Sequence, residues 1–317
     1  MSRFSRIGRR LGRSLVVVWL AMSAVFVLTN LIGDPAVASL GPRAHESQIA
    51  EFRRAHQLDR PFYAQYAAYF GGLATGDLGR SYRDEQPVLD VLWTRMTRTM
   101  QLGAMALVLE LILGVAIGIV AALRKNTFVD TALMSLAFLG VSTPSFLLGL
   151  VFLQVLAFRL GLFPVGGYGV DALDHVRHGF LPAFTLAVLG AATYARLLRS
   201  ELVETLRADY VRTARAKGMP RASVVLRHAL RNALLPIVTV AGLSLPLLVG
   251  GAIITESIYD WPGVGRLAIE AIYTLDVPVL LCVVLFSALA VQVGNVGADL
   301  VIAWLDPRVA VGEERDR

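Results

Sequence analysis

Long apolar runs separated by charged segments constrain this chain more than any other feature of its sequence. An α-helix needs about 20 apolar residues to cross the hydrocarbon core of a bilayer, and its backbone polar groups have to be satisfied within the helix. Charged residues make up only 17% of the chain, too few for an ordinary soluble domain. The sequence therefore predicts an all-α integral membrane protein with six transmembrane helices, at residues 14–32, 99–123, 131–158, 180–195, 234–258 and 278–305.

The third run is too long for a simple span. Residues 131–158 are 28 consecutive residues without a charge. As one helix they would reach about 42 Å, whereas the hydrocarbon core is about 30 Å thick. Tilting, or a kink at Pro144, would absorb the excess. A helical hairpin broken at Ser142-Thr143-Pro144 is the alternative, but each half would then be too short to span. One long helix is therefore expected.

The distribution of Lys and Arg predicts the orientation of the spans. Five arginines and no acidic residue precede the first span. Because positive residues collect in cytoplasmic loops, the N-terminus is expected in the cytoplasm, and six spans return the C-terminus to the same side. The opening residues also resemble a secretory signal peptide. No small-residue cleavage site follows the apolar run, so an uncleaved anchor is expected.

Charge also divides the chain into parts. The segment between the first two spans carries eight basic and eight acidic side chains, and short amphipathic helices are expected in it at residues 48–56 and 61–70. The predicted organisation is an N-terminal tail, first span and folded extracytoplasmic region over residues 1–98, a five-helix core over residues 99–305, and a cytoplasmic tail over residues 306–317.

A basic loop, residues 196–231, joins the fourth and fifth spans and holds nine Lys or Arg and three Asp or Glu residues. Within it, residues 209–220 predict a helix, a break and a second helix. Lys217 would lie where the helix dipole favours a cation, Gly218 suits the left-handed conformation, and Pro220 suits a new first turn. Anionic lipids attract any basic stretch, but that attraction needs no break. The corner therefore predicts docking against another protein.

The amino-acid sequence of this loop resembles that of the cytoplasmic coupling loop of permease subunits in ATP-binding-cassette importers. The general form of that loop is Glu-Ala-Ala, three residues, Gly, nine residues, then Ile-x-Leu-Pro. Ala214 and Gly218 agree with this form. The departures are Arg212 and Thr213 for the first two residues, His228 for the Ile and Arg231 for the Pro. The stretches most similar to the peptide/nickel branch of the family are residues 210–218, 228–236, 33–35, 58–61, 76–79 and 261–266.

This resemblance implies the fold of a type I importer permease, of the B-type found in dipeptide and oligopeptide systems, in a bacterial inner membrane. The partners it implies are a second homologous permease, two ATP-binding subunits, an extracytoplasmic substrate-binding protein, a peptide substrate and membrane lipid. It implies no cofactor and no metal. The loop residues expected to couple the chain to the ATPase are Arg212, Thr213, Ala214, Lys217, Gly218, Arg227 and Arg231.

Three polar side chains are expected inside the spans. Glu110 lies near the middle of the second span, where a carboxylate costs about 2–3 kcal/mol. It is compatible both with a pore-lining or proton-carrying role and with a buried structural acid. Asn295 and Asp299 are four residues apart in the sixth span, so they share one helix face and are expected to hydrogen-bond to neighbouring helices.

Enzymatic activity within the chain is not expected. Neither of its two lysines belongs to a phosphate-binding loop, so ATP would be hydrolysed by a separate subunit. No aromatic and basic surface module indicates nucleic acid. The open alternatives are a proton-coupled carrier that uses Glu110 and Asp299, or an importer of the same class for nickel complexes. A solvated loop is favoured over a metal site for Asp171, Asp174, His175 and His178.

Overall fold

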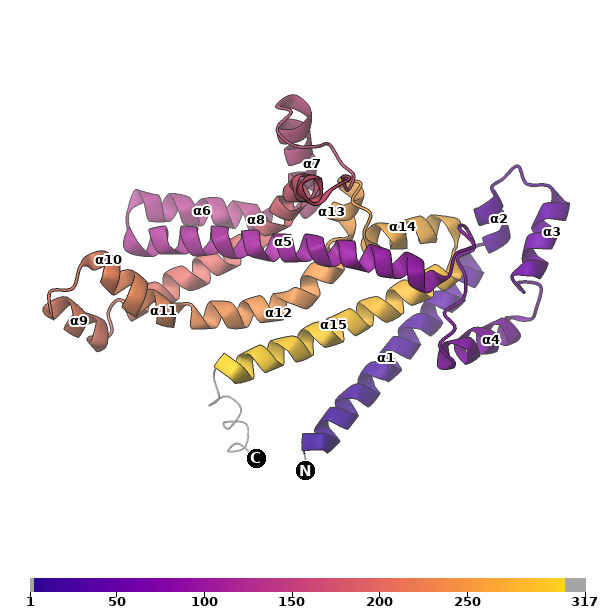
Figure 1. Ribbon diagram of the computed structural model, residues 1–317, viewed down its shortest axis with the longest axis horizontal. Helices are drawn as coiled ribbons and strands as arrows, with labels where there is room; N and C mark the ends of the chain where they lie inside the picture. The colour runs from indigo at the N-terminus through magenta and orange to yellow at the C-terminus, as the bar shows by residue number, and fades with distance from the viewer. Residues whose placement is uncertain (1–2, 306–317) are drawn as a thin grey trace. The chain divides into compact units, whose positions relative to one another are not determined.

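The computed structural model describes residues 3–305, with side chains except at residues 3–11, 13, 243, 245–251 and 295–305. Its regular elements are all helical, and η denotes a π-helical segment (Figure 1). In chain order they are α1 Arg3–Ile32, α2 Pro35–Leu40, α3 Glu46–Ala55, α4 Phe62–Ala74, α5 Val88–Leu123, α6 Phe128–Ser142, α7 Ser145–Phe152, η1 Leu153–Arg159, α8 Ala172–Thr205, α9 Asp209–Ala216, α10 Arg221–Ser223, η2 Val224–Ala229, α11 Leu230–Ala233, α12 Leu235–Gly251, α13 Ile253–Ile258, α14 Val264–Thr274 and α15 Val277–Leu305.

The lengths and compositions of these helices fit membrane spans. Among the described residues, four helices are long and apolar enough to cross a bilayer: Ser14–Ile32 within α1, all of α5, all of α8, and Val277–Gly294 within α15. Two further pairs of helices, each bent at a short break, raise the number to six when each pair counts as one span. The predicted all-helical membrane fold is confirmed.

The prediction of one long helix over residues 131–158 is wrong. The structure has α6 there, then a bend of 105° into α7 and η1, and Figure 1 shows α7 pointing away from the direction of α6. Thr143 lies at the bend in an extended conformation, with φ −88° and ψ 130°. Pro144 explains the break, because its ring disfavours the helical conformation at the preceding residue and it has no N–H to donate.

Two helices extend well beyond their apolar runs. The helix α8 covers Ala172–Thr205, although the apolar run predicted a span over residues 180–195 only. The helix α5 begins at Val88, before the predicted start of its span. Hydropathy marks the part of a helix that matches the bilayer core, whereas helical hydrogen bonding continues into the polar flanks. Residues 196–205, expected in the basic loop, are therefore the last turns of α8.

The chain forms two compact units, each with its own core. The first comprises residues 1–98 and 263–290. In it, Met22 and Phe26 of α1 pack with Val277 and Leu281 of α15. Aromatic rings of α4 complete this cluster. The two short helices predicted between the first two spans are present as α3 and α4.

A buried polar contact holds the corner that precedes α15. Ser81 Oγ donates a hydrogen bond of 2.6 Å to Asp276 Oδ2, and the Asp276 residue is only 3% exposed. Burial raises the pKa of the Tyr82 phenol, and the negative charge of Asp276 adds to the rise. Tyr82 therefore remains neutral across the physiological pH range.

The second unit comprises residues 99–262 and 291–317, and its α5 and α8 approach each other through glycine. A Cβ atom at Gly114 would lie 2.5 Å from Tyr194 Cβ, and one at Gly118 would lie 2.9 Å from the carbonyl oxygen of Ala195. Small residues let the backbones of membrane helices come this close. The hydroxyls of Tyr194 and Ser244, 2.9 Å apart, extend the contact to α12. These three helices support the site described next.

Candidate functional site

The break predicted at Gly218 is present. Helix α9 ends at Ala216, and Gly218 follows with φ +79°, the left-handed conformation that favours glycine. The N–H of Lys217 donates to the carbonyl of Thr213 at 3.1 Å, and the N–H of Gly218 donates to that of Arg215 at 2.9 Å. These bonds close the helix end, so the chain can turn and begin α10 after Pro220.

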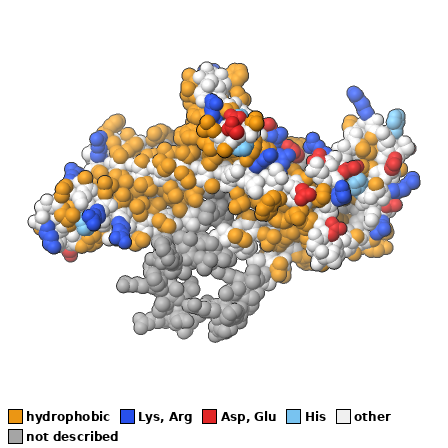
Figure 2. Space-filling model, viewed as in Figure 1, with side chains coloured by type: hydrophobic (Ala, Val, Ile, Leu, Met, Phe, Trp, Pro, Cys, Tyr) orange, Lys and Arg blue, Asp and Glu red, His pale blue; other side chains and the backbone are white. Residues whose placement is uncertain are grey.

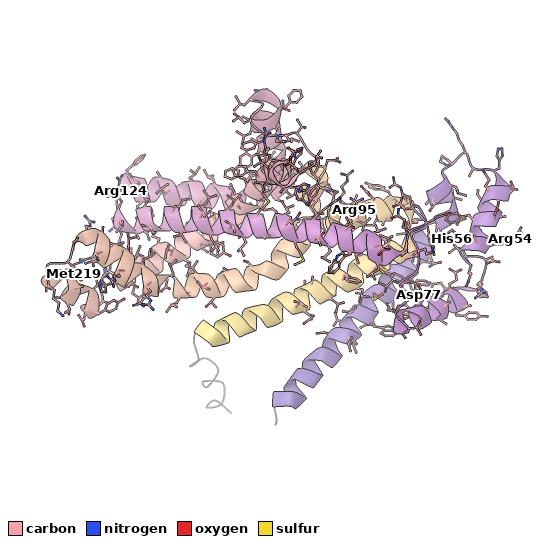
Figure 3. All side chains as sticks on the ribbon, in the orientation of Figure 1. Arg54, His56, Asp77, Arg95, Arg124 and Met219 are labelled. Carbon is pink, nitrogen blue, oxygen red and sulfur yellow. The ribbon has the colours of Figure 1, made fainter. Side chains whose placement is uncertain are left out.

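The second half of the corner is built from three short helical pieces, α10, η2 and α11. We call residues 209–233 the bent segment; Met219 lies at its tip (Figure 3). Its two halves are tied together, because Asn232 Nδ2 on α11 donates a hydrogen bond of 2.8 Å to the Tyr210 hydroxyl on α9. The bent segment is therefore a closed corner and not an open loop.

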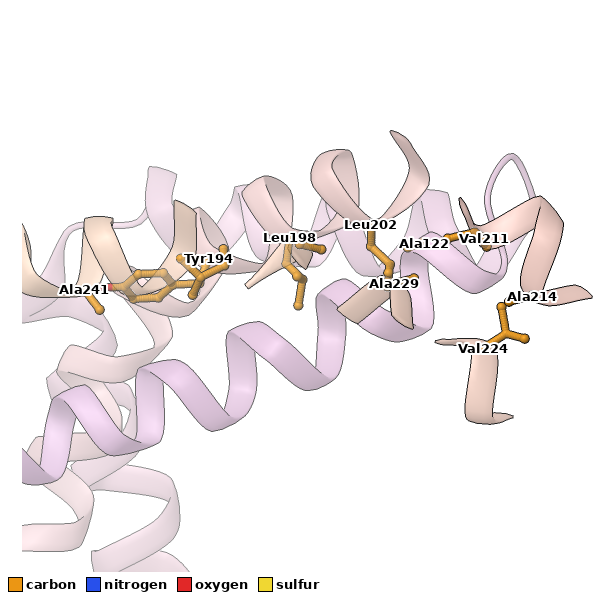
Figure 4. Packing of buried hydrophobic residues seen from close by; sticks show 11 residues of the cluster. Ala122, Tyr194, Leu198, Leu202, Val211, Ala214, Val224, Ala229 and Ala241 are labelled. Atoms are coloured by element: carbon orange, nitrogen blue, oxygen red, sulfur yellow. The ribbon is translucent and has the colours of Figure 1, made fainter. Parts of the chain in front are cut away.

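One face of the bent segment is buried against the scaffold. Val211 and Ala214 of α9, with Val224 and Ala229 of η2, join Leu198 and Leu202 of α8 in one hydrophobic cluster (Figure 4). Ala214, expected among the coupling residues, belongs to this buried face. Burial of an apolar side chain contributes about 1.5–3 kcal/mol for residues the size of Val or Leu, so the bent segment is held firmly to the end of α8.

The opposite face is exposed and cationic. Six of the seven residues expected to couple the chain to a partner lie there. Arg215 and Arg221 add cations that the motif did not include, and the exposed Arg207 lies just before the segment. Figure 2 shows Lys and Arg side chains gathered over α9–α11. Arg212 and Asp209 approach to 3.6 Å, but both side chains are largely exposed, so their ion pair adds little stability. The exposed residues from the prediction are Arg212, Thr213, Lys217, Gly218, Arg227 and Arg231.

His228 is a feature of the bent segment that the motif comparison noted only as a departure. It lies in the π-helical segment η2, and its buried Nε2 has no hydrogen-bond partner within the described residues. Burying a polar nitrogen without a hydrogen-bond partner costs about 1–3 kcal/mol of folding free energy. Short π-helical segments recur at functional sites, and this one adjoins the exposed arginines.

The intramembrane acid of α5 lies between two helices. Glu110 is 4% exposed, and a Cβ atom built at Gly190 of α8 would overlap its carboxyl group. Gly190 therefore provides the space that this side chain occupies. Asn295 and Asp299 lie on α15, but their side chains are outside the described residues.

The acidic and imidazole residues 171–178, expected in a loop, form the N-cap and first turns of α8 and have local structural contacts. Asp171 Oδ1 accepts the N–H of Asp174 at 2.9 Å and caps α8. Asp174 Oδ2 accepts the N–H of Val170, and its Oδ1 lies 3.5 Å from His178 Nδ1. Over the described part of the chain, no three His, Cys, Asp or Glu side chains are grouped in a way that could hold a metal ion.

Residues 114–311 match the family described as binding-protein-dependent transport system inner membrane component, and residues 1–103 match the corresponding N-terminal family. The chain belongs to this family: it is a multi-pass inner-membrane permease component and not an enzyme. The resemblance seen in the sequence is thereby confirmed.

Individual proteins agree with this assignment. The oligopeptide transport system permease protein AppB of Bacillus subtilis is 33% identical over 300 residues, covering 93% of this chain and 95% of AppB. The glutathione transport system permease protein GsiC of Escherichia coli K12 is 36% identical over 302 residues, covering 95% and 97%. The fold is similar to a chain of the MetNI methionine ABC transporter, with a TM-score of 0.58, 16% identity, and coverage of 69% of this chain and 98% of that one.

Proposed function

We propose that this chain is the permease subunit of an ATP-driven importer of short peptides. It works with a second, homologous permease, two ATP-binding subunits and an extracytoplasmic substrate-binding protein. Relatives named as oligopeptide and glutathione permeases support a peptide cargo, since glutathione is itself a tripeptide. The substrate-binding protein makes the main selection among cargoes, and this chain contributes half of the path across the bilayer.

The observation that carries this proposal is the two-sided bent segment. Its apolar face is buried on α8, and its polar face is exposed and holds Arg212, Thr213, Lys217, Arg227 and Arg231. A segment bound only to lipid needs neither the left-handed turn at Gly218 nor the Tyr210–Asn232 bond. The polar face docks into an acidic groove of an ATP-binding subunit, while the buried face passes the displacement on to α8.

The orientation follows from the same assignment. The bent segment faces the cytoplasm, where ATP is available, and the arginine-rich N-terminus lies on the same side. The C-terminal tail, residues 306–317, lies outside the described residues, and six spans return it to the cytoplasmic side as well. The α2–α4 region then faces the substrate-binding protein outside. Exposed apolar side chains of the spans contact lipid and the second permease.

Whether uptake depends on ATP or on a proton gradient tests this proposal directly. The chain is reconstituted in liposomes with its second permease, ATP-binding subunits and binding protein, and uptake of labelled Ala-Ala, Ala-Ala-Ala and glutathione is measured. We expect uptake of at least one of these peptides to require ATP and to persist when an ionophore removes the proton gradient. Uptake that continues without ATP, and stops with the ionophore, would instead identify a proton-coupled carrier.

Glu110 is a structural acid in this proposal, while Asn295 and Asp299 place one polar face of α15 towards other helices of the complex. Because Gly190 leaves just enough room for the Glu110 carboxyl group, Glu110→Gln keeps the shape of the contact. We expect uptake within about twofold of wild type at normal membrane abundance, as for other shape-conserving replacements. Glu204→Gln, at an exposed position of α8, is the control. Loss of uptake only in Glu110→Gln would show a proton-carrying or pore-lining role.

A further inference from the structure

A bidentate ion pair joins α6 to α8 within the second unit. Arg199 Nε donates to Asp130 Oδ1 at 2.6 Å, and Arg199 Nη2 donates to Asp130 Oδ2 at 2.6 Å. The N–H of Asn126 adds a third bond to Oδ2, at 2.9 Å. Asp130 is only 3% exposed, so its carboxylate is enclosed by these donors. Paired hydrogen bonds between a guanidinium and a carboxylate fix both distance and direction.

The third bond extends the pair to the turn between α5 and α6. Arg124 begins this turn (Figure 3), and its carbonyl accepts the N–H of Thr127 at 3.1 Å. Asn126 adopts φ +61° there, a conformation that Asn tolerates better than most residues. Asp130 therefore connects the turn, the first turn of α6 and, through Arg199, the end of α8.

Arg199 lies on the same turn of α8 that carries the bent segment. Leu198 and Leu202 of that turn are in the hydrophobic cluster with Val211 and Val224. Successive residues of a helix point about 100° apart, so Leu198 can face the bent segment while Arg199 faces α6. One turn of α8 thus contacts both elements.

Nearer the other end of α6, the two helices approach each other at Gly140 through apolar atoms. A Cβ atom at Gly140 of α6 would lie 3.2 Å from Val188 Cγ1 of α8, which shows a close apolar approach. Apolar attraction is non-directional, so it resists separation of the two helices more than it resists sliding. The Arg199–Asp130 pair is directional and sets the register between them.

We propose that Arg199 and Asp130 are a positioning pair that makes α6 follow α8 when the bent segment is displaced. This inference rests on the proposed function, in which an ATP-binding subunit moves that segment. The displacement of α6 then reaches the break at Thr143 and Pro144, where α7 begins. Without the pair, α8 still moves with the bent segment, but α6 slides along α8 and does not follow it.

The test compares Asp130→Asn and Arg199→Lys with wild type in the reconstituted complex. Lysine keeps the charge of Arg199 but cannot make the paired bonds. Uptake of the best-imported peptide among Ala-Ala, Ala-Ala-Ala and glutathione is measured with ATP hydrolysis in the same liposomes. We expect the ATP consumed per imported peptide to rise about tenfold in both variants, while ATP hydrolysis per assembled complex stays near wild type. Arg196→Lys, at an exposed position of the same helix, is the control with an unchanged ratio.

Two outcomes would overturn the inference. In one, the ratio of ATP to peptide is unchanged in complexes that assemble normally. In the other, neither variant assembles, or uptake and hydrolysis fall together, and the pair is then only a folding contact. The exchanged variant Asp130→Arg with Arg199→Asp is expected to recover the ratio at least partly. Wild-type liposomes that show no ATP-dependent uptake would contradict the proposed function itself, a result separate from either outcome.

Discussion

Replacing Gly114 by Val is expected to destabilise the chain strongly, so that most of the folded protein is lost from the membrane. Its new Cβ would lie 2.5 Å from Tyr194 Cβ and 2.9 Å from the carbonyl oxygen of Ala191. Both atoms are fixed to the α8 backbone, so neither can rotate away, and α5 has to move off α8. Overpacking of this kind costs about 1–3 kcal/mol or more. The thermal midpoint in detergent, followed by size-exclusion chromatography, measures the effect.

A matched control separates this clash from the general effect of a new side chain. Gly71 lies in helix α4, and a Cβ atom there would meet nothing within 4 Å. Gly71→Val is therefore expected to change the thermal midpoint little. An equal loss in both variants would show that close α5–α8 contact does not determine the stability of the chain.

Replacing Gly218 by Val is expected to separate ATP hydrolysis from uptake. Gly218 has φ +79°, and a Cβ atom built there would meet nothing within 4 Å, so the cost is backbone strain alone. A residue with a side chain loses about 1–2 kcal/mol in this conformation, and a β-branched one is especially disfavoured there. The corner then opens, and the exposed face no longer fits its partner. We expect normal membrane abundance, with uptake in vesicles falling about tenfold or more for that loss of fit.

Asparagine provides the control for this strain. Asn adopts the left-handed conformation more readily than other non-glycine residues, so Gly218→Asn should retain much of the uptake that Gly218→Val loses. Equal uptake in the Val variant and wild type would mean that the shape of the corner does not matter to coupling.

The sequence was sufficient for features that depend on composition and local chemistry. Apolar length predicted the first and last spans closely, and the Lys217-Gly218 sequence predicted the left-handed turn. Arg227 and Arg231, predicted to dock, are exposed in the structure, whereas their neighbours Val225 and Ala229 are buried.

Features that depend on contacts between distant residues were not predictable in this way. Span length predicts one helix over residues 131–158, because each half of a broken helix is too short to cross the bilayer. The restriction that Pro144 imposes on the preceding residue has the larger effect, and the helix breaks there. The partnership of Asp130 and Arg199 joins positions 69 residues apart, and the motif comparison singled out neither. The motif places Ala214 among the docking residues, whereas its position in α9 directs its side chain into the hydrophobic cluster.

A cross-linking measurement tests the central claim most directly. The chain has one cysteine, the buried Cys282, which is replaced by Ala before a single new cysteine is introduced. Thr213→Cys places it on the exposed face of the bent segment, and Val170→Cys places it in the exposed segment before α8, which the proposed orientation puts outside the cell. A thiol-reactive photo-cross-linker is then attached in membranes containing the whole transport system. We predict an adduct between residue 213 and an ATP-binding subunit, and none from residue 170. Labelling of residue 213 by an impermeant reagent from outside, or no ATPase adduct from it, would contradict the account.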